Sequence, residues 1–217
     1  IIASAVWEVF MSPLRILYFS ILLGTLALNG GIARAATILV FGDSLTAGYG
    51  LSGRDSFPSR LEAALRDVVP GIRVINGGVS GDTTAGGLAR LDWLMRGKPD
   101  LVIVELGAND ALRGHDPAAT RRNLDAIITQ ILARGARILL AGMRAPPNMG
   151  AEFANEFNAL FLDLARLHNI AFYRFFLDGV AGIPALNLND GMHPNARGIA
   201  VIVERMLPAI RAALIGK

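Results

Sequence analysis

The chain has 217 residues, a hydrophobic fraction of 53% and a formal net charge of +3 at pH 7. This charge is small and its lysines and arginines are scattered along the chain, so the composition gives no support for a nucleic-acid partner. Cysteine is absent, which excludes a thiol nucleophile, a thiolate metal site and disulfides.

The beginning of the chain has the pattern of an export signal. A short basic start at Met11 leads into an apolar run, Ile16–Leu28, and a small-residue ending, Ala33-Arg34-Ala35. This order is typical of a cleavable secretory signal peptide. A membrane anchor is the alternative, but the run is shorter than the roughly 20 residues that span a bilayer. We therefore expect residues 1–35 to be removed and the protein to be periplasmic or secreted, with no stable membrane span.

The rest of the chain, residues 36–217, has the length of one domain with one sizeable core. Residues 1–10, which precede Met11, fit no part of a signal, and the fold prediction does not include them. No repeat or low-complexity linker divides residues 36–217, so a second domain is not expected.

Short apolar segments alternate with segments of helical periodicity. The expected strands are Thr37–Phe41, Arg73–Ile75, Leu101–Leu106, Arg137–Ala141 and Ala171–Phe175. The expected helices are Phe57–Val69, Thr83–Arg96, Thr120–Arg134, Ala154–His168 and Asn195–Ile215. This alternation predicts an α/β fold with a parallel five-stranded sheet covered by helices on both faces. Ligands of such sheets bind beyond the carboxyl ends of the strands.

A serine follows the first expected strand, in Gly42-Asp43-Ser44-Leu45. At the carboxyl end of a buried strand a serine is well placed to act as a nucleophile, provided that a base removes its proton. The same residues also suit a turn or a helix cap, in which Asp43 or Ser44 accepts from free N–H groups. The motif alone leaves both interpretations open.

Two further strand ends carry groups that suit an oxyanion. The second strand leads into a glycine-rich stretch in which Gly81 is expected to open the next helix, and its backbone N–H can approach a substrate closely. The third strand leads into Gly107-Ala108-Asn109-Asp110, where the Asn109 amide is a donor. Asparagine is also common in tight turns, so Asn109 fits both roles.

Near the carboxyl end, Asp190-Gly191-Met192-His193-Pro194 precedes the last helix. If the chain turns between them, Asp190 can hold the His193 imidazole in the tautomer that leaves its other nitrogen free for a serine. The alternative is that Asp190 or Asn195 caps the helix and His193 is merely exposed. Of the other two histidines, His168 ends an expected helix, and His115 lies in a loop at the mouth of the expected site.

The blocks Gly42-Asp43-Ser44-Leu45, Gly81, Gly107-x-Asn109-Asp110 and Asp190-x-x-His193 resemble, in order, the four sequence blocks of the SGNH (GDSL-type) hydrolases. The resemblance extends over essentially all of residues 36–217. Val104–Gly114 and Ser80–Thr84 look most similar to the multifunctional branch of periplasmic lysophospholipases, thioesterases and arylesterases. The resemblance implies a flavodoxin-like three-layer sandwich and a carboxylic-ester hydrolase that needs no cofactor and no metal.

Carried over residue by residue, the resemblance implies Ser44 as nucleophile, His193 as base and Asp190 as its orienting partner. The implied oxyanion donors are the Ser44 N–H, the Gly81 N–H and the Asn109 side chain. Ala108 departs from the pattern, because similar proteins often have a second glycine there.

The substrate is expected to lie among three loops, Ala47–Phe57, Ala111–Pro117 and Arg144–Gly150. Their candidate substrate-binding residues are Leu112, Arg113, Pro146, Pro147 and Met149, with Leu51 and Ala145 nearby. Most of these side chains are apolar and suit an acyl or aryl group, although the same residues could simply cap the core. We expect a monomer that acts on small-molecule esters or thioesters, lipid esters included.

Two other functions remain open on the sequence alone. A polysaccharide acetyl esterase would keep the same chemistry on an open polar groove, and a non-catalytic exported binding protein would keep only the scaffold. The Gly-x-Ser-x-Gly elbow of ordinary α/β-hydrolases is missing around Ser44. No His-x-x-x-His or carboxylate cluster suggests a catalytic metal.

Overall fold

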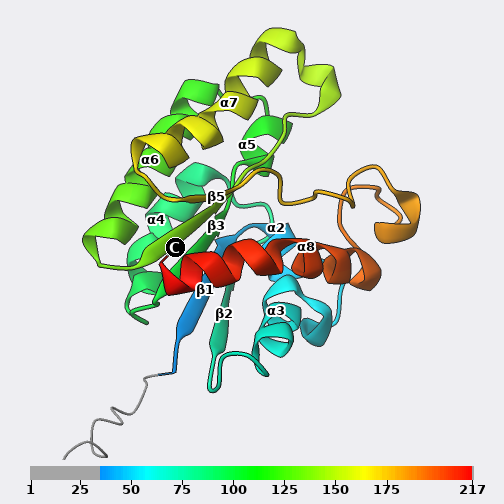
Figure 1. Ribbon diagram of the computed structural model, residues 1–217. Helices are drawn as coiled ribbons and strands as arrows, with labels where there is room; N and C mark the ends of the chain where they lie inside the picture. The colour runs from blue at the N-terminus through cyan, green and yellow to red at the C-terminus, as the bar shows by residue number, and fades with distance from the viewer. Residues whose placement is uncertain (1–34, 217) are drawn as a thin grey trace, which may run out of the picture. The chain divides into compact units, whose positions relative to one another are not determined.

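The computed structural model describes residues 35–216 of the chain (Figure 1). The expected signal peptide falls almost wholly on residues 1–34, outside the described residues. From Ala35 onward the chain forms one compact unit.

Five parallel strands form a single sheet in the order β2-β1-β3-β4-β5. The strands are β1 (Thr37–Gly42), β2 (Arg73–Gly78), β3 (Leu101–Glu105), β4 (Arg137–Ala141) and β5 (Ala171–Tyr173). This is the flavodoxin-like strand order. The expected α/β fold with a parallel five-stranded sheet is therefore confirmed.

Helices cover both faces of the sheet (Figure 1). The longer helices are α3 (Phe57–Leu65), α4 (Thr84–Met95), α6 (Pro117–Ala133), α7 (Ala151–Leu167) and α8 (Ala196–Ile215). Helices α4, α6 and α7 pack side by side on one face, and α3 and α8 pack together on the other. Two short helices, α2 (Ser44–Ala47) and α5 (Ala108–Leu112), follow β1 and β3 directly, and the 3-10 turns are Gly53–Asp55, Pro147–Met149 and Pro184–Leu186.

The core lies around the three central strands. In β3, Leu101–Val104 is fully buried, and Ile38–Phe41 of β1 is at most 1% exposed. Strands covered on both faces must be apolar on both faces, which explains the continuous apolar runs that made them recognisable in the sequence. The core fixes the carboxyl ends of β1 and β3, and these strand ends carry Asp43 and Glu105.

Several element boundaries differ from those expected. Strand β2 continues to Gly78 because Gly77 and Gly78 pair with the last residues of β1. Helix α6 begins three residues early, since the Asp116 side chain accepts from the Ala118 N–H and Pro117 suits the first turn. Gly81 does not open a helix, which corrects that expectation: α4 begins at Thr84 and Thr83 caps it.

Candidate active site

Ser44 is the first residue of the short helix α2, in the sharp turn that follows β1. The Asp43 side chain caps this helix by accepting from the Leu45 N–H at 3.0 Å. Gly42 ends β1, where a Cβ would lie 2.2 Å from Thr46 Oγ1 and 2.4 Å from Glu105 Oε2. Glycine is needed there because a side chain would force apart the strand and the helix that carries Ser44.

The Ser44 hydroxyl lies 2.9 Å from His193 Nε2, although the two residues are 149 positions apart in the chain. His193 Nδ1 lies 2.7 Å from Asp190 Oδ2. A carboxylate accepts only, so this contact assigns the Nδ1 hydrogen to the Asp190 side and leaves Nε2 as the acceptor for Ser44. The structure thus brings together the three side chains that the sequence nominated as a triad.

Asp190 is held by the turn that it starts. Its Oδ1 accepts from the His193 N–H at 3.0 Å and from the Met192 N–H at 2.9 Å. These two backbone hydrogen bonds, followed by the bond to the His193 ring, lower the pKa of Asp190 to about 2. The Asp190 carboxyl is consequently ionised at neutral pH.

Asn195 fixes the turn from its other side. Its side chain accepts from the Arg197 and Gly198 N–H groups at the start of α8 and donates to the carbonyls of Ala185 and Asn187. The helix cap that the sequence allowed is therefore made by Asn195 and not by Asp190. His193 is not merely exposed, because its ring is bonded on both sides.

Two of the three expected oxyanion donors, Gly81 and Asn109, lie in the segments that follow β2 and β3. Gly81 has φ +82°, in the left-handed region that favours glycine, and its carbonyl accepts from Arg113 Nη2 at 2.8 Å. Asn109 lies in α5, and its Nδ2 donates to Asp43 Oδ2 at 3.0 Å. This bond uses one amide hydrogen and leaves the second available to another acceptor.

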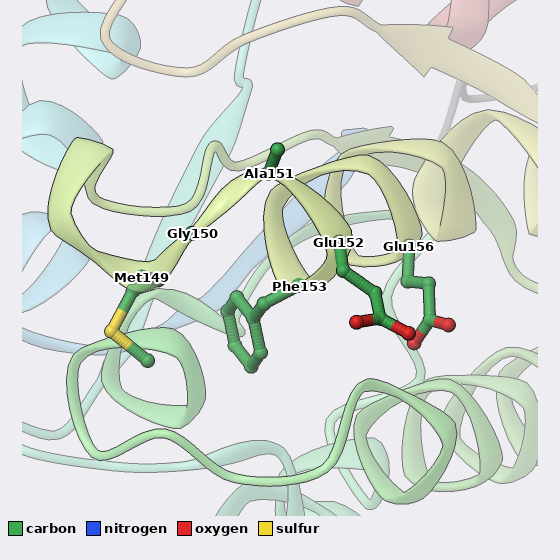
Figure 2. A pocket seen from close by; sticks show the side chains of 6 residues that line it. All are labelled: Met149, Gly150, Ala151, Glu152, Phe153 and Glu156. Atoms are coloured by element: carbon green, nitrogen blue, oxygen red, sulfur yellow. The ribbon is translucent and has the colours of Figure 1, made fainter.

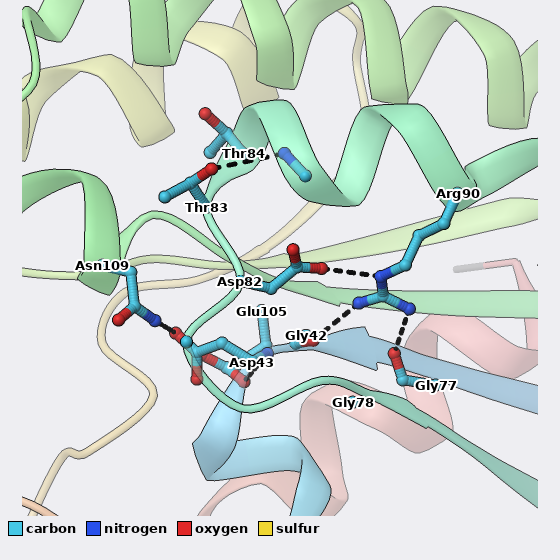
Figure 3. A network of polar contacts seen from close by, with 12 residues as sticks. Gly42, Asp43, Gly77, Gly78, Asp82, Thr83, Thr84, Arg90, Glu105 and Asn109 are labelled. Carbon is cyan, nitrogen blue, oxygen red and sulfur yellow. Dashed lines mark hydrogen bonds and ion pairs between the residues drawn. The ribbon is translucent and has the colours of Figure 1, made fainter.

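Two carboxyl groups next to Ser44 in the fold, those of Asp43 and Glu105, are buried. Figure 3 shows the two residues close together, and the Asp43 N–H donates to Glu105 Oε2 at 3.4 Å. Burial raises the pKa of Asp43 to about 6 despite the hydrogen bonds from Leu45 and Asn109. Burial and the neighbouring Asp43 carboxyl also hold the pKa of Glu105 well above its ordinary value. Glu105 Oε2 accepts from Thr46 Oγ1 at 2.7 Å, whereas Glu105 Oε1 has no partner. A neutral Glu105 fits this arrangement, since an unpaired buried carboxylate is costly.

Arg90 of α4 joins three segments around this pair (Figure 3). Its guanidinium donates to Asp82 Oδ2 at 2.6 Å, to the Gly77 carbonyl at 2.7 Å and to the Gly42 carbonyl at 2.9 Å. Neither Arg90 nor Glu105 belongs to a motif that pointed to the site in the sequence. A lone carboxylate within the apolar run Leu101–Leu106 was the signal that could have revealed Glu105.

Ser44 and His193 open into a cavity of about 620 Å³. Its further lining is mostly apolar and includes Tyr49, Leu112, Met143, Ala145, Pro146, Pro147, Phe175, Leu177 and Met192. Leu112, Pro146 and Pro147 are thus where the sequence expected them, as is Ala145. Leu51 instead lines a smaller pocket, which Ser44 and His193 also line.

Arg113 and Met149 are not among the residues that line this cavity. Arg113 contacts the site indirectly, through the Gly81 carbonyl. Met149 lines a separate hollow at the start of α7 together with Phe153 and the carboxylates of Glu152 and Glu156, as Figure 2 shows.

The other two histidines lie away from Ser44. His168 ends α7, as expected, and its Nε2 lies 2.5 Å from Asp125 Oδ1. His115 lies outside the cavity lining, with its Nδ1 3.8 Å from Asp110 Oδ1. Within residues 35–216 no three His, Asp or Glu side chains gather as a metal site, and no helix is long and apolar enough to cross a membrane.

The sequence matches the GDSL-like Lipase/Acylhydrolase family over residues 40–201. It is 39% identical over 183 residues to esterase TesA of Pseudomonas aeruginosa, covering 84% of this chain and 91% of that protein. It is 38% identical over 164 residues to thioesterase 1/protease 1/lysophospholipase L1 of Escherichia coli K12, covering 75% of this chain and 77% of that protein.

The fold is also similar to a solved structure, AlinE4, which is described as an SGNH-hydrolase family esterase. The TM-score is 0.70 at 46% sequence identity, covering 84% of this chain and 98% of AlinE4. The family match spans most of the chain, and the curated relatives are esterases or thioesterases by name. The chain therefore belongs to the GDSL-like lipase/acylhydrolase family of SGNH hydrolases and is a carboxylic-ester hydrolase.

Proposed function

We propose that the protein hydrolyses esters and thioesters through an acyl-enzyme on Ser44, with His193 as general base and Asp190 as its orienting partner. The observation that carries this proposal is the continuous chain from Ser44 Oγ to His193 Nε2 at 2.9 Å and from His193 Nδ1 to Asp190 Oδ2 at 2.7 Å. These are hydrogen-bond distances suited to proton transfer without rearrangement.

In the first half of the reaction, Ser44 Oγ forms a bond to the substrate carbonyl carbon while its proton passes to His193 Nε2. The carbonyl electron pair moves onto oxygen. This oxyanion accepts from the Ser44 N–H, the Gly81 N–H and the second hydrogen of Asn109 Nδ2. The tetrahedral intermediate then collapses, the bond to the leaving group breaks, and the leaving alcohol or thiol takes the proton from His193.

In the second half, water replaces the alcohol. The water oxygen attacks the acyl carbon while a water proton passes to His193. The bond between the acyl carbon and Ser44 Oγ then breaks, Ser44 regains a proton from His193, and the acid is released. Asp190 stays ionised throughout, because its pKa of about 2 lies far below neutral pH. It therefore stabilises the positive imidazolium in both halves without taking a proton itself.

The substrate class that fits best is an apolar acyl or aryl ester, with acyl thioesters and lysophospholipids as further members. The mostly apolar lining of the cavity of about 620 Å³ supports this choice. So do the names of the relatives, which include an esterase, an arylesterase and a thioesterase/lysophospholipase. We expect a monomer.

A panel of alkyl and aryl esters with acyl groups from acetyl to palmitoyl, together with one acyl thioester, one lysophospholipid and one acetylated polysaccharide, tests the substrate class. We expect kcat/KM to be highest for an apolar acyl or aryl member. Activity confined to the acetylated polysaccharide would overturn the proposed class and favour the acetyl esterase alternative.

Replacing Ser44 with alanine tests the mechanism. Turnover should fall by about 10³-fold or more while the fold is kept, because the nucleophile is lost from groups that act as a unit. A fluorophosphonate probe followed by peptide mapping should label Ser44 in the wild-type protein. Labelling at Ser52, Ser56 or Ser59, or near-normal turnover of Ser44→Ala, would contradict the assignment.

We also propose that residues 1–35 are an export signal and that the mature protein, a single domain over residues 36–217, is periplasmic or secreted. The basic start, the apolar run and the small-residue ending support this proposal. Protein recovered from the periplasm should begin at Ala36 by amino-terminal sequencing. Recovery of the intact segment Ile16–Leu28 in washed membranes would mean that it is an anchor.

A further inference from the structure

Tyr49 packs its ring against the imidazole of His193. The two ring centroids are 4.5 Å apart and the planes are inclined by 36°. Tyr49 lies in the turn after α2, where its N–H donates to the Ser44 carbonyl at 3.1 Å. A backbone hydrogen bond thus links Tyr49, whose ring contacts the imidazole, to Ser44, which carries the hydroxyl.

Two carboxyl groups act on the His193 ring. Asp190 holds one side of the ring, and Asp43 of the β1–α2 turn acts on it through charge alone. Arg144 also lines the cavity, with its guanidinium 4.5 Å above the Phe175 ring. Among the ring contacts of the described residues, the one to the imidazole comes from Tyr49.

We propose that Tyr49 is a positioning residue that stabilises the imidazolium form of His193 during acyl transfer. The proposal rests on the triad proposed above. When Nε2 takes the Ser44 proton the imidazole becomes a cation, and the negative face of a tyrosine ring attracts a cation within about 6 Å of its centroid. The neutral imidazole gains less from this contact, so the contact is stronger in the transition state than in the ground state. Its effect is therefore to raise kcat.

The same contact favours the charged imidazole in the resting enzyme. The activity of an enzyme with a histidine base rises with pH, because the neutral imidazole is the working form. Removing the aromatic ring should therefore move this ascending limb of the activity profile toward lower pH. A side chain that merely filled space would change substrate binding or stability and would leave the midpoint of this limb in place. The pH profile separates the two roles.

Three variants of Tyr49 test the proposal with p-nitrophenyl acetate, a small substrate that minimises contacts with the rest of the cavity. Tyr49→Leu removes the ring and keeps an apolar side chain. We expect kcat to fall roughly twofold to thirtyfold, the range that corresponds to cation–π energies, and the midpoint of the kcat/KM profile to shift toward acid. Tyr49→Phe keeps the ring and should retain both values.

Tyr49→Trp presents a stronger aromatic face and should move the midpoint toward higher pH. This variant decides the question if Tyr49→Leu fails to fold by circular dichroism. Leu112→Ala is the matched control, because Leu112 lines the same cavity and is exposed to the same extent, 53%. Leucine has no aromatic face to attract the imidazolium, so this variant should alter KM and leave the midpoint unchanged.

The results distinguish this inference from the proposed triad. An active Ser44→Ala protein would overturn the triad itself. An inactive Ser44→Ala protein together with a wild-type midpoint in Tyr49→Leu and Tyr49→Trp would overturn only the role of Tyr49. Equal acid shifts in Tyr49→Phe and Tyr49→Leu would also overturn it, since they would assign the effect to the hydroxyl.

Discussion

Asn109 and Asp43 show how one side chain can prepare another for catalysis. Asp43 Oδ2 holds one hydrogen of the Asn109 amide, which fixes the amide plane and the direction of its second hydrogen. The sequence left open whether Asn109 serves a turn or an oxyanion. Its side chain does not bond the backbone of its own turn among the described contacts, and it faces the cavity that contains Ser44.

We expect Asn109→Ala to lower kcat by about 10²–10³ and to leave KM nearly unchanged, because the lost donor acts on charge that develops in the transition state. Asn109→Asp should be at least as inactive, since it puts a carboxylate beside Asp43 and the oxyanion. Steady-state kinetics with thermal unfolding as a control checks both. A wild-type kcat in folded Asn109→Asp would remove Asn109 from the mechanism.

The two aspartates of the site should have opposite effects on stability as the pH changes. Asp43 has its pKa raised from 3.8 to about 6, so the folded protein binds a proton that the unfolded chain releases in this range. Its contribution to stability is present below pH 3.8 and is lost as the pH rises through 6. Asp190 has a lowered pKa, so its contribution is present above pH 3.8 and is lost as the pH falls toward 2.

The measurement is urea unfolding at pH 4.5 and pH 7.5. Asp43→Asn should gain stability relative to the wild type between these two values, by about 2 kcal/mol, since most of a shift of about two pKa units falls within this range. Asp190→Asn should show no such gain. Below pH 4.5, the difference in free energy of unfolding between the less stable Asp190→Asn and the wild type should become smaller as the pH falls. A constant difference between Asp43→Asn and the wild type would contradict the raised pKa.

The turn before α8 both starts this helix and positions His193, the proposed base. Asn195 satisfies two N–H groups of α8 and two carbonyls of the preceding loop. His193 is two residues away, and its own carbonyl accepts from the Leu188 N–H at 2.7 Å. The position of the imidazole therefore depends on the cap of this helix.

Asn195→Ala should lower the free energy of unfolding by about 2–3 kcal/mol, because it removes a helix cap and leaves two carbonyls without donors. Asn195→Asp keeps the acceptor for α8 and should lose less. Chemical unfolding gives the stability, and kcat should fall in the same order, though by less than in Ser44→Ala. An unstable Asn195→Ala protein with full kcat would separate the cap from the base.

The sequence predicted the longer elements well because their patterns are internal to each element. Continuous apolar runs identify β1, β3 and β4, which are buried on both faces. Helices α2 and α5 were missed, since four or five residues are too short to show periodicity. Their helical form depends on contacts from elsewhere, such as the bond from Asn109 in α5 to Asp43 in the cap of α2.

The candidate site was predicted only where its residues form short blocks along the chain. Arg90 and Tyr49 lie outside such blocks, and their roles come from contacts that exist only in the folded chain. Arg90 meets the carbonyls of Gly42 and Gly77 across the end of the sheet. Tyr49 meets a histidine from the other end of the chain.

The candidate site is assembled from segments that are far apart in the sequence of the described unit. Ser44 and His193 meet only when the sheet and α8 are both in place, and no disulfide holds them together. Activity should therefore be lost together with the fold. We expect the urea transitions followed by esterase activity and by circular dichroism to coincide. Loss of activity at clearly lower urea would show that the loops of the site open on their own.

Both ends of the described chain lie near the amino ends of the strands, and the cavity lies beyond their carboxyl ends. Ala35 precedes the amino end of β1 and lies beside Gly71, just before β2. Gly216 ends α8 near Arg137, the first residue of β4. Ser44, Asn109 and the cavity lie beyond the carboxyl ends of β1 and β3. The enzyme can therefore be immobilised on a solid support through either of these ends with its cavity still turned toward the solution.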